Sequence, residues 1–178
     1  IVISRLLPSL FRYSHTHRLA SYFRTVRHTL DRHAPSGDEN EATIVLLSPG
    51  PANESYFEHA YLANYLGYTL VEGSDLVVRE NRVWLKTLEG LRPVHVILRR
   101  MDDSYCDPVE LREDSYLGVP GLMNAVRAGN VTVANPLGSG VLESPALMRY
   151  LPELSRLLLG QDLVLPSVEV VEGLAAPG

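Results

Sequence analysis

Three short segments of the sequence combine the residue types that hold small polar ligands. They contain Ser48, Gly50 and Asn53 in the first segment, Arg99, Arg100, Asp102 and Asp103 in the second, and Asn135, Gly138, Ser139 and Gly140 in the third. Glycine lets backbone N–H groups approach a ligand closely, and an arginine pairs with a carboxylate or a phosphate. The sequence therefore indicates a binding site for a small anion, with an amine as the alternative ligand of the two aspartates.

Each segment follows a short apolar run that has the pattern of a buried strand. Strands are predicted at residues 43–47, 68–71, 94–98 and 131–134, with a further edge strand at 163–165. Helices are predicted at 19–30, 55–67, 120–128 and 144–160, and a hairpin at 76–86. Because strands and helices alternate, the predicted fold class is α/β. We expect an open, mostly parallel, Rossmann-like sheet flanked by helices, with an N-terminal helix and the inserted β-hairpin at one edge.

Ligands of open parallel sheets bind beyond the carboxyl ends of the strands, which is where the three segments are predicted to lie. Two segments also lead into a helix N-terminus, whose unpaired N–H groups favour an anion. Ser55 and Glu58 have the spacing of a capping box for the first of these helices. Ser144 followed by Pro145 has the pattern of the start of the second.

The same residues also have plain structural explanations. The glycines would then be turn residues, and the segment 99–103 a solvated loop of mutual ion pairs. Glu143 stands where the third glycine of a dinucleotide-binding G-x-G-x-x-G motif would be, and Ser139 lies outside a G-x-S-x-G elbow. We therefore predict no catalytic residue and no metal ligand in this chain.

Three further residue types that often carry chemistry have structural interpretations here. His15 and His17 lack neighbouring ligands and are expected on a solvated face. Cys106 has no adjacent histidine and is expected to be a small buried or loop thiol. His59 lies beside the apolar face of its predicted helix and is expected to be a packing residue.

The first predicted helix has one apolar stripe and many basic residues. Leu19, Tyr22, Phe23, Val26 and Leu30 recur at helical spacing, and a polar linker follows at 35–40. Residues 1–33 carry six of the sixteen lysines and arginines but only one of the 21 acidic residues. We expect this helix to dock on a neighbouring part of the protein rather than to bind nucleic acid, because no nucleic-acid-binding motif follows.

Composition excludes several classes of protein. A chain of 178 residues with 46% hydrophobic and 21% charged positions is typical of a globular domain, which excludes disorder throughout. No apolar run reaches the roughly 18 residues of a membrane span, and we expect a cytoplasmic protein that binds no membrane. The single cysteine excludes a disulfide framework.

Five segments taken together resemble the circularly permuted ATP-grasp proteins of type 2. They are residues 47–59, 70–76, 99–103, 117–121 and 134–140, in that order along the chain. The resemblance covers residues 1–167, whereas the tail at 168–178 departs from the family pattern. It implies that residues 38–167 form the family's central pre-ATP-grasp domain, after an N-terminal lead-in and linker at 1–37 and before an irregular tail.

The resemblance implies an ATP-dependent carboxylate–amine ligase whose two ATP-grasp halves flank this domain. The Glu-Asp-Asn-x-Arg and Lys-Pro motifs of those halves do not occur in the sequence. We therefore expect no cofactor in this chain, and ATP and Mg²⁺ in the full-length protein. The expected partners are the flanking halves and a small acid or peptide-like substrate, and the chain alone is expected to be inactive. The alternative is a non-catalytic interaction or scaffold domain of a multidomain protein.

Overall fold

The computed structural model describes residues 6–14, 19–35 and 42–167. The chain divides into two compact units, Ile1–Asn135 and Pro136–Gly178, and each is described by itself. His15, His17, most of the predicted linker and the tail at 168–178 lie outside the described residues. The predicted domain boundaries at 37 and 167 therefore stay predictions.

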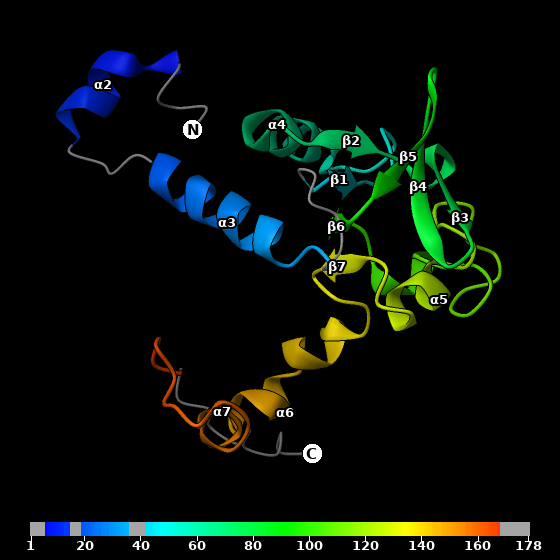
Figure 1. The fold of residues 1–178 in the computed structure, drawn as a ribbon. Coiled ribbons are helices and arrows are strands. Elements are labelled where there is room, and N and C mark those ends of the chain that lie inside the picture. Colours follow the sequence, from blue (N-terminus) through cyan, green and yellow to red (C-terminus); the bar gives the residue numbers. More distant parts are fainter. Residues whose placement is uncertain (1–5, 15–18, 36–41, 168–178) are drawn as a thin grey trace, which may run out of the picture. The chain divides into compact units, whose positions relative to one another are not determined.

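A parallel sheet forms the centre of the first unit (Figure 1). Its strands, in the order β2-β1-β6-β7, are β1 (Ile44–Leu47), β2 (Thr69–Val71), β6 (Val96–Arg99) and β7 (Thr132–Ala134). The helices of this unit are α2 (Pro8–Tyr13), α3 (Ala20–Arg32), α4 (Tyr56–Leu66) and α5 (Leu122–Arg127). The predicted α/β class with a parallel sheet and flanking helices is confirmed.

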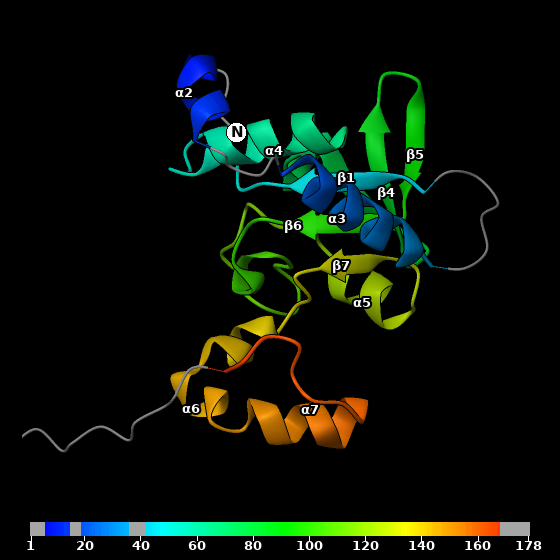
Figure 2. The same cartoon turned by 90° about the vertical axis from the view of Figure 1, so that its left-hand side faces the viewer.

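Helices cover both faces of the parallel sheet, which is why β1 is buried over all four residues. Figure 1 shows α3 and α4 on one side of the sheet and α5 on the other. On the first side Leu30 of α3 packs against Ile44 and Val96, and Figure 2 looks onto this face, with α3 in front of the strands. Only the end of the predicted apolar stripe is buried, since Leu19 and Tyr22 remain 51% and 60% exposed.

A second, antiparallel sheet is inserted between β2 and β6. It consists of β3 (Leu76–Arg79), β4 (Arg82–Thr87) and β5 (Gly90–Val94). Glu80 and Asn81 have φ angles of 52° and 56°, as a two-residue hairpin turn requires. The predicted hairpin is confirmed, and it belongs to a sheet that is separate from the parallel one. A third strand, β5, pairs with β4 in this sheet.

The segment between β6 and α5 is irregular apart from the short 3₁₀-helix η2 (Asp103–Tyr105). A fully buried carboxylate, Asp107, organises it. Its oxygens accept hydrogen bonds from the backbone N–H groups of Val109 (2.9 Å), Gly121 (3.1 Å) and Met123 (2.9 Å). Asp107 thus satisfies the otherwise unpaired amides at the start of α5 and ties the loop to that helix.

Two glycines let loops of the first unit pack backbone against backbone. A Cβ atom added at Gly73, in the 3₁₀-helix η1 (Gly73–Asp75), would lie 2.1 Å from the carbonyl oxygen of Leu117. A Cβ atom at Gly118 would lie 2.3 Å from the carbonyl oxygen of Tyr105. No other residue type fits at either position without displacing the opposite backbone.

The second unit contains the 3₁₀-helix η3 (Ser139–Glu143) and the helices α6 (Pro145–Met148) and α7 (Leu151–Leu159). The predicted single helix over 144–160 is wrong, because Pro152 has no N–H and its ring would clash with the carbonyl group of Met148. The predicted strand at 163–165 is also wrong, since these residues have no strand structure.

Among the described residues, no helix combines the length and the apolar character that a membrane crossing needs.

We expect Gly73→Ala to lower the free energy of unfolding by about 3 kcal/mol, because the added methyl group overpacks against a rigid carbonyl. Gly129→Ala is the matched control. Its Cβ would meet nothing within 4 Å, and its φ of +70° adds a backbone cost of only about 1 kcal/mol. Urea unfolding of both variants measures the two losses, and equal losses would contradict the close approach at Gly73.

Candidate functional site

The loop after β1 is held by a buried serine and a buried histidine. Ser48 is completely buried, and its N–H donates to the carbonyl oxygen of Val71 at 2.9 Å. Its Oγ accepts a hydrogen bond from the N–H of Gly50 at 3.2 Å and lies 3.0 Å from Nδ1 of His59 on α4. The pair of side chains therefore fixes the backbone where the chain turns from β1 toward α4.

His59 is only 3% exposed, in agreement with its predicted packing role. Burial lowers the pKa of its imidazole below the ordinary value, and the positive charge of Arg100 lowers this pKa further. The negative charge of Glu58 opposes both effects. A neutral ring at Ser48 is therefore favoured near pH 7.

The start of α4 differs from the predicted capping box. Ser55 occupies the N-cap position, but its side chain makes no capping hydrogen bond. Instead Oδ1 of Asn53 accepts the N–H of Ser55 at 2.9 Å, and the N–H of Asn53 donates to the carbonyl oxygen of Gly50 at 3.1 Å. Asn53 can accept the N–H of Ser55 because its short side-chain amide reaches this group from within the preceding turn.

The two arginines at the end of β6 have different surroundings. Nε of Arg99 donates to the carbonyl oxygen of Asn135 at 2.7 Å, and its Nη1 donates to the carbonyl oxygen of Met101. Asn135 returns a hydrogen bond from Nδ2 to the carbonyl oxygen of Arg99 at 3.1 Å. Arg99 and Asn135 thus fasten the ends of β6 and β7 together. Arg100 is exposed, and its side chain makes no hydrogen bond or ion pair with the residues that the structure describes.

The two aspartates of this loop begin a short 3₁₀-turn. Asp102 is exposed and occupies the N-cap position of η2, while Asp103 is its first residue. The carbonyl oxygen of Asp102 accepts a weak hydrogen bond from Sγ of Cys106 at 3.4 Å. Burial raises the pKa of this completely buried thiol to about 11, which agrees with the predicted inert cysteine.

A cavity of about 420 Å³ opens beside the loop after β1. It is lined by Ser48, Pro49, Pro51, Ala52, Asn53, Glu72, Gly73, Ser74, Tyr116 and Leu117. Glu72 is the one acidic residue of this lining, and it directly follows β2. The lining therefore joins the carboxyl ends of two neighbouring parallel strands with a wall from the irregular loop.

The structure brings some of the predicted site residues together and leaves others apart. Ser48 and Asn53 line the cavity beside Gly50. Arg99 ends β6, which pairs with β1, and Arg100, Asp102 and Asp103 follow it. The order of the sheet reverses between β1 and β6, where ligands of open α/β sheets bind. Gly138, Ser139 and Gly140 belong to the second unit, and Gly138 is the N-cap of η3 with a φ of +85°.

Among the lining residues that were not predicted as site residues are Glu72 and Tyr116. Glu72 had a usable signal, because it follows a predicted strand just as Ser48 does. Tyr116 is 90% exposed and lies in a segment without regular structure, so no pattern in the sequence marks it.

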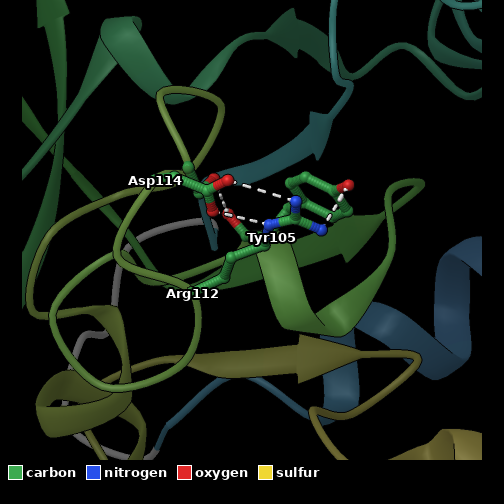
Figure 3. Close-up of polar contacts among 4 residues, drawn as sticks. Tyr105, Arg112 and Asp114 are labelled. Atoms are coloured by element: carbon green, nitrogen blue, oxygen red, sulfur yellow. Dashed lines mark hydrogen bonds and ion pairs between the residues drawn. The ribbon is translucent and has the colours of Figure 1, made fainter.

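The loop next to Tyr116 is braced by a cluster of three side chains on the surface (Figure 3). The guanidinium group of Arg112 binds both carboxylate oxygens of Asp114, at 2.6 and 3.2 Å, and also the hydroxyl oxygen of Tyr105 at 2.7 Å. The hydrogen bond to Arg112 lowers the pKa of Asp114. The cluster ties the irregular segment before the cavity wall to η2, and the charges of Arg112 and Asp114 neutralise each other.

The chain is an α/β protein with a cavity at the carboxyl ends of its parallel strands, which is where open α/β sheets bind their ligands. Comparison with protein families gives the family itself. The family model "Circularly permuted ATP-grasp type 2" matches residues 1–173, and the chain belongs to this family. The resemblance seen in the sequence is thereby confirmed.

Curated relatives come from mycobacteria and a cyanobacterium. The uncharacterized protein Rv2567 of Mycobacterium tuberculosis is 42% identical over 97% of this chain and 19% of its own length. The uncharacterized protein ML0605 of Mycobacterium leprae is 42% identical over 95% and 30%. The uncharacterized protein sll0335 of Synechocystis is 38% identical over 94% and 34%. The chain thus spans a fifth to a third of the length of these relatives.

We expect the stability of the chain to fall as the pH drops below 6.5, the ordinary pKa of histidine, and His59 to contribute to this loss. Because the pKa of His59 is lower in the folded state, the unfolded state takes up the proton first and is favoured by acid. The contribution is complete above the unfolded-state pKa and is lost as the pH falls through the folded-state pKa.

The measurement compares urea unfolding at about pH 7.5 and about pH 5.5 for the native chain and His59→Gln. His59→Gln should show a smaller difference between the two pH values, whereas His28→Gln, at an exposed position of α3, should behave like the native chain. An unchanged pH dependence in His59→Gln would show that this histidine does not carry the effect.

Proposed function

We propose that this chain is the substrate-binding, pre-ATP-grasp region of an ATP-dependent ligase that joins a carboxylate to an amine. Membership of the ATP-grasp family supports the reaction class. The observation that carries the site is the exposed guanidinium group of Arg100 at the point where the order of the parallel strands reverses. An arginine there suits a carboxylate substrate, because a guanidinium group holds both carboxylate oxygens.

In such a ligase the substrate carboxylate takes the γ-phosphoryl group of ATP, which forms an acyl phosphate and ADP. The amine then attacks the acyl carbon, and inorganic phosphate leaves as the amide forms. This chain contributes orientation and charge compensation, which are the main sources of catalysis in phosphoryl transfer. Within this chain, Arg100 holds the carboxylate of the substrate.

We assign ATP and Mg²⁺ binding to the flanking halves of a longer protein, since the chain spans only 19–34% of its curated relatives. Among the described residues no three side chains of His, Cys, Asp or Glu gather as a metal site. The role proposed for Arg100 involves no bound metal ion. The flanking halves would be the physical partners of this region.

We expect Arg100→Ala, in the longer protein that carries this region, to raise the KM for the carboxylate substrate about tenfold or more. This is the effect of losing one charge-assisted pair of hydrogen bonds. ADP release in the presence of a panel of small acids and amines measures it. Arg92→Ala, at an exposed position of β5, should leave KM unchanged. An unaltered KM in Arg100→Ala would remove Arg100 from the site.

A further inference from the structure

The cavity beside β1 and β2 has a negative electrostatic character that the proposed carboxylate contact does not explain. Of its ten lining residues, Glu72 alone carries a full charge at neutral pH. No lysine or arginine contributes to the lining, and Glu72 forms no ion pair with the residues that the structure describes. A half-buried carboxylate without a cationic partner is costly, so a positively charged ligand is the natural counterpart.

The carboxylate of Glu72 is held in place on two sides. It accepts the N–H of Asp75, while Oδ2 of Asp75 accepts the N–H of Glu72 at 2.8 Å, so that the two residues form a reciprocal capping box around η1. On the other side, Oε2 of Glu72 lies 3.0 Å from the position that a Cβ atom of Gly50 would take. The absence of a side chain at Gly50 thus leaves room for the carboxylate against the loop after β1.

A basic side chain of the antiparallel sheet, Lys86 of β4, contacts the cavity wall. Its Nζ donates to the carbonyl oxygen of Ser74 at 2.8 Å. This contact ties β4 to the cavity wall, and Lys86 forms no ion pair with Glu72 in the part of the chain that the structure describes. The lone pairs of the Glu72 carboxylate that do not bind Asp75 remain acceptors for a ligand.

The rest of the cavity suits the body of a small organic cation. Pro49, Pro51, Tyr116 and Leu117 give it apolar surface, and Ser48 and Asn53 are polar members of its lining. A volume of about 420 Å³ falls within the range of small-molecule sites and accommodates a dipeptide-sized ligand. Tyr116 is 90% exposed, so its ring is available to cover such a ligand.

We propose that this cavity binds the free ammonium group of an amino-acid-like or peptide-like substrate, with Glu72 as its counter-ion. An ammonium group held by a carboxylate is protonated and cannot act as a nucleophile, so this group identifies the substrate and does not react. In terms of the proposed ligase, on which this assignment to a substrate rests, Glu72 selects acids that carry a free amino end. Glu72 is therefore a specificity residue.

The test is a titration of the 178-residue chain with two probes, followed by the backbone amide signals of Gly50, Gly73 and Ser74 in ¹H–¹⁵N spectra. The first probe is glycyl-leucinamide, which has a free amine and no carboxylate. The second is its N-acetyl derivative, which has the same body without the charge. We expect the amine to bind about tenfold more tightly, as one charge-assisted hydrogen bond implies.

Glu72→Gln should abolish this preference, because the amide keeps an oxygen for the N–H of Asp75 but loses the charge. Glu89→Gln is the matched control, since Glu89 is an exposed turn residue between β4 and β5. Equal binding of both probes, no shift of the three amide signals, or a preference that survives in Glu72→Gln would overturn the inference. Because the titration needs no turnover, it is independent of the Arg100→Ala experiment: amine binding without ligase activity would refute the proposed function alone.

Discussion

The carboxyl ends of the parallel strands are shaped by backbone packing without intervening side chains. The η1 turn rests on the carbonyl groups of Leu117 and Gly118, and Gly118 in turn rests on the carbonyl groups of Tyr105 and Cys106. This stack of three loops fixes the distance between the end of β2 and the irregular segment. The cavity, the position of Glu72 and the placement of Tyr116 all depend on it, because each lies on one of the stacked loops.

Around that stack, the polar groups divide into those that hold the framework and those that remain free for a ligand. Arg99, Asn135 and Asp107 have carbonyl or N–H partners that connect separate loops. Arg100 and Glu72 instead present charges of opposite sign near the ends of β6 and β2, on either side of β1. A molecule with both an anionic and a cationic end matches this arrangement better than a simple anion does.

Local patterns of the sequence predicted a helix or strand correctly where a single physical factor determines its structure. The apolar run at Ile44–Leu47 can only be a strand buried on both faces, and the pair Glu80-Asn81 between alternating strands marks a hairpin. The prediction of one long helix at 144–160 was wrong because it rested on the start signal at Ser144 and Pro145 and took no account of Pro152, whose missing N–H divides α6 from α7. The third strand of the antiparallel sheet, β5, was not predicted. It contains Pro93, and a proline within a run of residues is more typical of a loop than of a strand.

The site was less predictable, for a physical reason. Strand-end residues such as Ser48 and Arg100 follow from the rule for parallel sheets, but the side chain that occupies a cavity is decided by contacts between distant segments. Glu72 is oriented by the space over Gly50, and Asp107 by amides up to sixteen residues further along the chain. No periodicity records such partners. The roles of Arg99 and Arg100 could not be separated by sequence either, because only the fold turns one guanidinium group toward carbonyl oxygens.

Cys106 has a practical consequence for work on this molecule. It is the sole thiol of the chain, it is completely buried, and with a pKa of about 11 it is almost entirely protonated at neutral pH. Maleimides and similar reagents react with the thiolate form of cysteine, so the native chain is nearly unreactive toward them. A cysteine introduced on the surface, for example by Tyr116→Cys at the mouth of the cavity, would be a single attachment point for a fluorophore. The buried thiol thus makes the protein ready for site-specific labelling without removal of any native residue.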